Sequence, residues 1–203
     1  MKPADAADAR RGRLLAAAKQ LFFAHGFTDV TTDMIARDAS VSKATIYRHF
    51  ASKDAIFAEV IQEESRKFAA GSPENFESEE EFRQTLTTFG ERALALIFDP
   101  AKIRFERLIL QHADAHPRGA ELFHENAHRS TLERLTTIIS SGQSAGFARD
   151  DIRATQLADY LLSMWKGMYH GACQLGVDPI TPIDTGVRVQ EAIDILFPTG
   201  TKS

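Results

Sequence analysis

The chain has 203 residues, of which 43% are hydrophobic and 26% charged, a composition typical of a globular protein. This length accommodates one large domain or two small ones. No apolar run reaches the roughly 18 residues that a membrane span requires, and the N-terminus lacks the apolar core of a signal peptide. The single cysteine, Cys173, excludes an intramolecular disulfide. We therefore expect a cytoplasmic protein that makes no membrane contact.

The net charge of −4 conceals an asymmetry along the chain. Residues 1–55 carry nine Lys/Arg and six Asp/Glu, whereas residues 56–203 carry fifteen and twenty-two. A cationic N-terminal part on an acidic remainder indicates that only the N-terminal part meets a polyanion.

The first predicted helix covers about residues 10–25, and Gly26 is expected to end it as a left-handed cap. Its apolar residues recur at helical spacing on one face, which predicts a buried stripe. The stripe consists of Leu14, Leu15, Ala18, Leu21 and Phe22.

Two short helices are predicted next, joined by a tight turn at Ser40-Val41. Thr32 is expected to cap the first of them, and Ser42 the second. The second runs to about Tyr47 and buries Ile46, with Phe50 closing its end. Two short helices around a tight turn are typical of a helix-turn-helix, which presents its second helix to the DNA major groove.

The remaining chain also has helical periodicity, with a polar loop at residues 70–78. The fourth helix is expected to begin after Ser52, the fifth at the Ser78–Glu81 capping box, and the sixth at Asp99-Pro100. His116-Pro117 is expected to end the sixth helix or bend it into the seventh.

Caps and prolines also predict where the last three helices begin or end. The seventh helix runs to about Ala145 and is closed by Gly146. The eighth begins at Asp150 or Asp151 and reaches about Leu175, and the ninth begins at Thr181-Pro182 and ends near Phe197. Nine helices without a convincing strand predict an all-α protein.

The N-terminal end of the third helix carries the residues suited to DNA. Lys43 and Thr45 can donate hydrogen bonds to phosphates or bases, and the small Ala44 lets the backbone approach the groove. Tyr47 and His49 have polar tips suited to phosphate oxygens. Arg48 matches guanine O6 and N7 with two hydrogen bonds, so we expect it to read a base.

Two other helix starts favour a phosphate, at Thr32 and Lys53, because exposed N–H groups and the helix dipole attract anions there. The segment with Arg10, Arg11 and Arg13 is expected to follow the DNA backbone or enter a minor groove. Ser- or Thr-capped helices with one lysine and one arginine also occur on ordinary helical surfaces, so these residues alone leave DNA binding open.

Residues 14–61 resemble the DNA-binding domain of the TetR family of bacterial transcriptional regulators. The resemblance rests on Leu-Leu-Ala-Ala-Ala-Lys-Gln-Leu-Phe-Phe-Ala-His-Gly-Phe, Thr-Thr, Ile-Ala, and Ala-Ser-Val-Ser-Lys-Ala-Thr-Ile-Tyr-Arg-His-Phe-Ala-Ser-Lys. It implies that one set of residues holds phosphates and another faces the groove. The first set is Thr32, Ser42, Tyr47, His49 and Lys53, and the second is Lys43, Ala44, Thr45 and Arg48. Ala44 departs from the glycine that is common there, which leaves the operator sequence in doubt.

The rest of the chain, from Arg104 to Leu175, is similar to the AefR-type C-terminal domain of that family. The resemblance implies a nine-helix TetR-like fold with a DNA-binding domain at residues 1–55 and a ligand-binding and dimerisation domain at 56–203. It also implies a homodimer through the last two helices, whose apolar stripes can pair as a four-helix bundle. The same stripes fill the core of a monomer equally well, and periodicity does not separate the two.

A small-molecule pocket is expected between the fourth and eighth helices, where aromatic and methionine side chains suit an apolar or aromatic effector. Many such residues are buried in any helical core, so part of this set is expected to be plain core. The candidate lining residues are Phe89, Ile97, Phe105, Leu108, Ile109, His112, Phe123, Met164, Trp165, Met168 and Tyr169.

Two histidine pairs, His112/His116 and His124/His128, have the i, i+4 spacing that can chelate a transition metal. A third ligand is not evident, and such pairs are common on solvated helices, so we predict no metal site and no cofactor. Nucleotide loops, metalloprotease helices and nucleophile elbows are absent from the sequence, so we expect no enzyme.

The sequence thus predicts a ligand-responsive transcriptional repressor that binds a palindromic operator in double-stranded DNA as a homodimer. A helical ligand-binding or enzyme domain with an incidental basic N-terminal part is the alternative.

Overall fold

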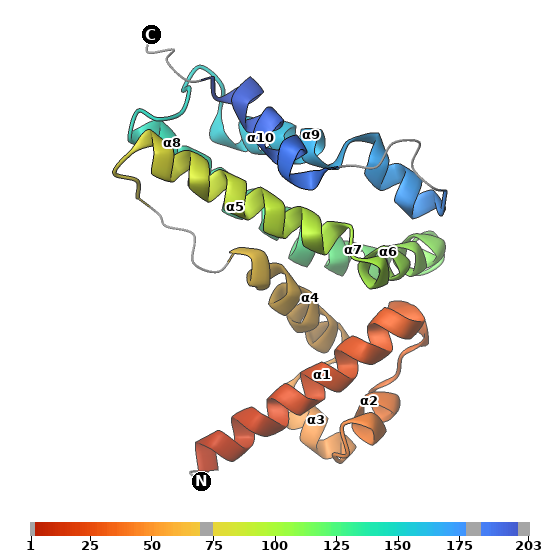
Figure 1. Ribbon diagram of the computed structural model, residues 1–203. Coiled ribbons are helices and arrows are strands. Elements are labelled where there is room, and N and C mark those ends of the chain that lie inside the picture. The colour runs from red at the N-terminus through yellow and green to blue at the C-terminus, as the bar shows by residue number, and fades with distance from the viewer. Residues whose placement is uncertain (1–2, 70–74, 178–183, 199–203) are drawn as a thin grey trace. The chain divides into compact units, whose positions relative to one another are not determined.

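The computed structural model describes residues 3–69, 75–177 and 184–198, and in these residues helices are joined by turns without any strand (Figure 1). The helices are α1 (Pro3–Asp29), α2 (Thr32–Asp38), α3 (Lys43–His49), α4 (Lys53–Ala69), α5 (Glu79–Ile97), α6 (Pro100–His112), α7 (Pro117–Phe123), the π-helical segment η1 (His124–Arg129), α8 (Ser130–Ser144), α9 (Ala154–Leu175) and α10 (Thr185–Leu196). Because α7, η1 and α8 follow one another directly, the described residues form nine helical rods, which confirms the predicted all-α fold. None of the described helices combines the length and apolarity needed to cross a bilayer.

The chain divides into two compact units by packing. The first comprises residues 1–65 and 100–127, and the second comprises residues 66–99 and 128–203. In the first unit, α6 and α7 are grouped with α1 to α4, and α1 packs against α6. The predicted functional boundary after residue 55 stays a prediction.

A cluster of phenylalanines forms the core of the first unit. Phe22, Phe57 and Phe105 are fully buried, and the Phe22 and Phe57 rings meet edge to face at 5.0 Å. Phe27 packs against Phe57 at 4.9 Å. Burial of each such side chain stabilises the fold by about 2–3 kcal/mol, so α1, α4 and α6 hold one another through these rings.

The end of α1 is seated closely against α6 and α7. Gly26 interrupts the helix with φ 75° and ψ −179°, so the break lies where the sequence predicts it, although ψ is extended rather than left-handed helical. A Cβ atom on Gly26 would lie 3.3 Å from Leu108, and one on Gly119 would lie 3.0 Å from Phe27. Glycine therefore permits a close approach at both positions.

Three predicted helix starts need correction or lie beyond the described residues. Thr31, not Thr32, caps α2, because its side chain accepts the Met34 N–H. Neither Asp150 nor Asp151 opens α9: Asp151 pairs instead with Arg149 at 2.7 Å, and the helix begins at Ala154. Asp184 caps α10, and the predicted start at residues 181–182 lies outside the described residues.

Other predicted boundaries are confirmed. Ser42, Ser52 and Ser78 each accept a backbone N–H three residues onward. The Glu81 side chain accepts the N–H of Glu77 rather than that of Ser78, so the capping box is displaced by one residue. Gly176 closes α9 in the left-handed conformation.

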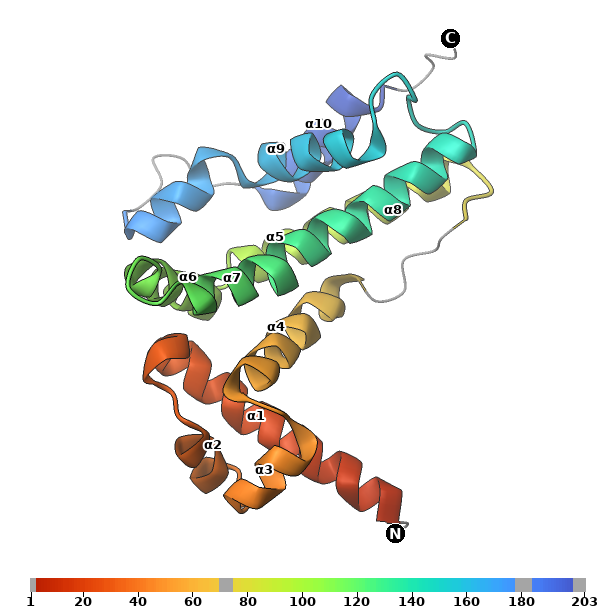
Figure 2. The same ribbon diagram turned by 180° about the vertical axis from the view of Figure 1, so that it is seen from behind.

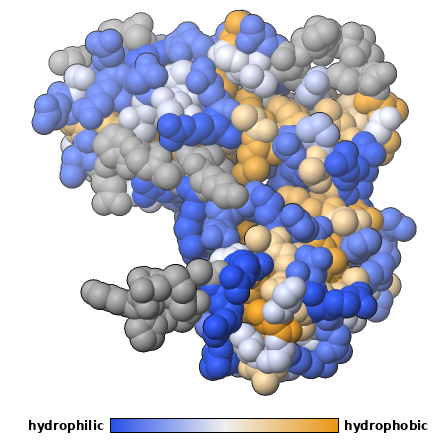
Figure 3. Space-filling view, turned by 60° about the horizontal axis from the view of Figure 1, so that its bottom comes forward, coloured by the Kyte–Doolittle hydropathy of each residue, from blue (hydrophilic) through white to orange (hydrophobic). Residues whose placement is uncertain are grey.

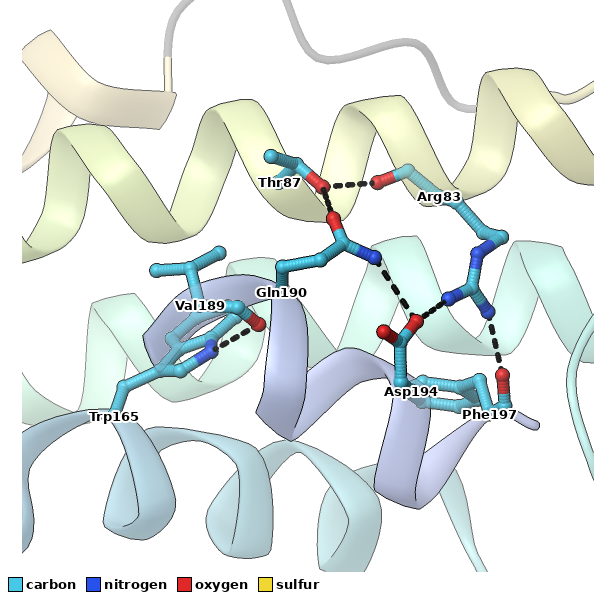
Figure 4. Close-up of polar contacts among 7 residues, drawn as sticks. All are labelled: Arg83, Thr87, Trp165, Val189, Gln190, Asp194 and Phe197. Atoms are coloured by element: carbon cyan, nitrogen blue, oxygen red, sulfur yellow. Dashed lines mark hydrogen bonds and ion pairs between the residues drawn. The ribbon is translucent and has the colours of Figure 1, made fainter. Parts of the chain in front are cut away.

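The second unit has α5, α8, α9 and α10 packed around Trp165 (Figures 1 and 2). The Trp165 ring is fully buried against Gly90 of α5, where a Cβ atom would lie only 2.8 Å from the ring. Its indole N–H donates to the Val189 carbonyl at 3.4 Å. Figure 4 shows α5 joined to α10 by polar contacts, in which Arg83 bonds Asp194 and the Phe197 carbonyl.

The predicted eighth helix, α9, is broken at Gly167, a feature that periodicity does not predict. Gly167 has φ 51° and ψ −163°, and the Arg188 side chain of α10 occupies the space where a Cβ atom would lie. Arg188 Nε donates to the Trp165 carbonyl at 2.7 Å. The guanidinium thus satisfies a carbonyl group at the break in the helix.

The segment η1 widens the helix between α7 and α8 by one residue per turn. Asn126 within it donates to the Leu122 carbonyl at 2.8 Å and accepts from Gln62 of α4 at 2.6 Å. Asn126 therefore links the π-helical segment both to the end of α7 and to α4.

Candidate nucleic-acid interface

The α2–α3 segment has the geometry of a helix-turn-helix. Ile35 and Ile46 are fully buried and hold the two helices together. Ser40 adopts φ 53°, a left-handed conformation that turns the chain, and the Val41 N–H donates to the Ala36 carbonyl at 2.9 Å. The turn at Ser40-Val41 is therefore where the sequence predicts it.

The side chains of Lys43 and Ser42, at the start of α3, form hydrogen bonds to other residues of the helix-turn-helix. Lys43 Nζ lies 2.9 Å from the Asp33 carboxylate of α2, and this hydrogen bond and charge raise the pKa of Lys43. Ser42 Oγ accepts the Thr45 N–H at 3.1 Å and lies 2.9 Å from the Thr45 hydroxyl. The ammonium group keeps two further donors for an external acceptor.

Ala44, Tyr47 and Arg48 are exposed on α3. The Tyr47 side chain is large and apolar apart from its hydroxyl, yet the residue is 51% exposed. Within the described parts of the chain, no acidic group lies within ion-pair distance of Arg48. An exposed arginine with unused donors is available to bind a base or a phosphate.

Three predicted phosphate-binding residues are partly enclosed. Thr32 is half-buried in the first turn of α2. His49 is half-buried, and its Nε2 is enclosed without a hydrogen-bond partner among the described residues. Lys53 Nζ donates to the Phe27 carbonyl at 2.9 Å, and burial lowers the pKa of Lys53. A phosphate contact through His49 Nε2 would require the ring to turn.

The arginines of the N-terminal segment differ in their surroundings. Arg11 pairs with Glu59 of α4 at 3.0 Å, and its guanidinium lies 5.3 Å from the centre of the Phe50 ring. Arg13 is exposed and Arg10 is half-buried. Arg13 is therefore the member of this segment with its side chain most open to a DNA backbone.

The predicted effector-binding residues fall into two separate cores. Phe105, Ile109 and Phe123 belong to the core of the first unit. Phe89 and Trp165 are buried in the core of the second unit, where Met164 packs against them. That these five core residues line one effector pocket stays a prediction.

The remaining predicted effector contacts are less enclosed. Tyr169 meets the Phe98 ring edge to face at 4.9 Å, and His112 is half-buried at the end of α6. Met168 is 92% exposed, just after the break in α9. In this conformation Met168 lines no enclosed space.

The sequence analysis missed a buried charge on α6. Lys102 is 5% exposed, and its ammonium lies 4.7 Å from the centre of the Phe123 ring and within 6 Å of the Phe23 and Phe105 rings. Glu106, one turn later, is also buried. The i, i+4 pair of opposite charges between apolar positions was a signal for this site.

Two cavities of about 520 Å³ are lined by residues outside the predicted effector-binding set. One lies in the first unit beside Lys53, His116 and Arg118. The other lies in the second unit along hydroxyl-bearing residues of α8 such as Thr137, Ser140 and Ser144.

The two histidine pairs occupy different kinds of backbone. His112 ends α6 and His116 precedes α7, so this pair does not share one helix, whereas His124 and His128 lie in η1. Among the described residues, no three His, Cys, Asp or Glu side chains are grouped as metal ligands.

The chain matches known proteins along most of its length. Residues 14–60 match the description "Bacterial regulatory proteins, tetR family", and residues 84–198 match "AefR-like transcriptional repressor, C-terminal domain". The HTH-type transcriptional regulator UidR of Escherichia coli (strain K12) is 25% identical over 166 residues, which cover 78% of this chain and 79% of UidR.

Solved structures share the fold. The Flavonoid-responsive Regulator FrrA has a TM-score of 0.71 at 26% identity, with 93% of this chain and 95% of FrrA covered. A TetR transcriptional regulator from Agrobacterium tumefaciens has a TM-score of 0.75 at 22% identity, with 97% and 93% covered. Helix-turn-helix geometry, the open face of α3 and these matches agree, and the chain therefore belongs to the TetR family of DNA-binding bacterial transcriptional regulators.

Proposed function

We propose that this regulator is a repressor that binds a palindromic operator as a homodimer and is released by a small apolar or aromatic effector. The observation that carries the proposal is the exposed face of α3, where Tyr47 and Arg48 are open to solvent beside a helix start. A recognition helix of this kind reads base edges in the major groove with side chains near its N-terminal end.

The proposed roles on DNA follow the surroundings of each side chain. Arg48 binds a guanine edge, and Tyr47 donates its hydroxyl to a phosphate. Lys43 reaches the groove with the two ammonium donors that Asp33 leaves unused. Lys53 binds a phosphate only by sharing its ammonium with the carbonyls of Phe27 and Thr28.

The proposed dimer forms through α9 and α10. Large apolar side chains on these helices are open to solvent. Figure 3 shows one face of the molecule, on which hydrophobic residues lie in patches among hydrophilic ones. Exposed apolar area of this kind is stabilised by a second copy with the same surface. The exposed residues on the two helices are Tyr160, Met168, Leu175, Val187 and Ile195.

Effector binding is proposed to act through α4, the helix that follows the helix-turn-helix. Two bonds within the first unit link α4 to the neighbouring helical rod: Arg118 donates to Asp54 at 2.8 Å, and Gln62 donates to Asn126 at 2.6 Å. A ligand that alters the position of this rod changes the position of α4. Half-sites lie about 34 Å apart or a small multiple of it, so a shift of a few ångströms prevents both recognition helices from docking.

The proposed effector class is supported by the residues of the two cores and by similarity to one solved structure. The cores that contain the predicted lining residues are rich in phenylalanine, which suits flat apolar molecules. The similarity to a regulator described as flavonoid-responsive supports an aromatic compound.

The experiment that tests the proposal is selection of bound duplexes from a random-sequence pool, followed by footprinting of the enriched sequence. We expect a two-fold symmetric protected site and an affinity that falls steeply with salt. Arg48→Ala is expected to weaken binding to that site, with Arg104→Ala on α6, a second exposed arginine, as the matched control. Enrichment of no symmetric sequence would count against the proposal.

A further inference from the structure

An acidic side chain lies on the surface of the helix-turn-helix that is proposed to meet DNA. Asp33 is in the first turn of α2, and its carboxylate lies 2.9 Å from Lys43 Nζ at the start of α3. The Asp33 side chain is 68% exposed and that of Lys43 is 49% exposed. The pair is therefore open to solvent on the side from which Lys43 would approach the groove.

The pair has little to do with holding the fold together. An ion pair between exposed side chains contributes little to stability, because water screens it. Thr31 already satisfies an N–H group at the start of α2, through its bond to Met34, and Ile35 and Ile46 join the two helices by burial. An exposed carboxylate in the first turn adds only a small further stabilisation through the helix dipole.

The same carboxylate has a large effect beside a polyanion. Phosphates repel Asp33, and they attract Lys43 away from it. If Lys43 leaves for a phosphate, Asp33 stays unpaired next to the DNA, which disfavours that arrangement. If Lys43 keeps its bond to Asp33, its two other donors are held in a fixed direction and can bind acceptors on a base edge.

We infer that Asp33 is a specificity-determining residue: its bond to Lys43 disfavours binding to unselected DNA and directs the Lys43 ammonium toward base edges at the operator. The inference rests on the proposed docking of α3 in the major groove. Asp33 acts through Lys43, so it is a positioning residue rather than a base-reading one.

The test compares Asp33→Asn with Asp38→Asn by titration against two duplexes, the site enriched from a random pool and a scrambled duplex of equal length. Asp38 is the matched control, because it is an exposed aspartate on the same helix and makes no contact with Lys43. For Asp33→Asn we expect binding to the scrambled duplex to strengthen by about tenfold, and its salt slope to steepen by about one. Affinity for the enriched site should change much less, so discrimination falls.

A second comparison tests whether the effect passes through Lys43. In a Lys43→Gln background, Asp33→Asn should relieve repulsion from both duplexes alike and leave discrimination unchanged. Thermal melts of all variants at neutral pH should differ only slightly, since the pair is exposed.

Three results would overturn the inference. The first is an equal effect of Asp33→Asn and Asp38→Asn on both duplexes, which would make it a matter of net charge. The second is a loss of discrimination that persists without Lys43. The third, enrichment of no sequence by the unmodified protein, would remove the proposed function and this inference together.

Discussion

Two arginines in this chain have opposite surroundings. Arg48 on α3 is exposed, with its donors open to an external acceptor, whereas Arg188 on α10 fills the break in α9 and donates to the Trp165 carbonyl. The same planar group, with five donors, completes the fold in one place and is left for recognition in the other. Burial and the backbone around an arginine, rather than its residue type, decide which role it has.

The largest expected effect comes from the residue whose carbonyl Arg188 binds. Trp165→Ala would empty a fully buried site in the second unit, between Gly90 and Val189. We expect a loss of about 3–5 kcal/mol of stability, measured by chemical denaturation. Tyr47→Ala, at an exposed aromatic residue outside the proposed dimer surface, is the control and should lose far less.

Arg48→Ala tests the recognition side of the comparison. Loss of its hydrogen bonds should cost about 1–3 kcal/mol at the operator, which is about 5- to 160-fold in affinity, measured by titration with the enriched duplex. The melting temperature should not move, because the side chain is exposed. An unchanged affinity would remove Arg48 from the base-reading set.

Arg188→Met tests the structural side. Methionine keeps part of the side-chain volume but leaves the Trp165 carbonyl without its donor at the break. We expect a loss of about 1–2 kcal/mol, seen as a lower midpoint in urea. A midpoint equal to that of the unmodified protein would mean that water replaces the guanidinium without cost.

The smallest expected effect is a pH dependence at the Lys43–Asp33 pair. The bond to Asp33 raises the pKa of Lys43 above its unfolded value of 10.5, so the folded state holds this proton more tightly. The pair's contribution is thus complete below pH 10.5 and is lost as pH rises through the raised pKa. Melts of the unmodified protein and Lys43→Met, compared between pH 9.5 and pH 11.5 (about one unit either side), should draw closer as the pH rises.

Much of the fold is predictable because its boundaries are local. The hydroxyls of Ser42, Ser52 and Ser78 cap helices through bonds three residues away, and such short-range chemistry is visible in sequence. Thr31 and Thr32 are adjacent and chemically alike, so the sequence does not show which of them caps α2. The structure shows that Thr31 does, because its backbone is extended and its side chain accepts the Met34 N–H.

What could not be predicted depends on contacts far apart in the chain. The break at Gly167 needs Arg188, and the partial enclosure of Lys53 needs the end of α1. The DNA-facing set is similarly divided: Arg48 is open, but Lys43 and Lys53 have partners that no motif reveals. Residue spacing names the candidates, and only tertiary structure shows which of their donors remain.

Three consecutive residues at the beginning of α4 form polar contacts with different parts of the first unit. Ser52 binds the first turn of α4 itself, Lys53 binds the end of α1, and Asp54 binds Arg118 of α7. Gln62, nine residues beyond Lys53 and so about 14 Å along the axis, makes a separate bond to Asn126. If Gln62 is displaced sideways by about 2 Å while the contacts of Lys53 and Asp54 hold, α4 tilts by about 8° over that length. Such a displacement would rotate α4 about its first turn rather than translate it.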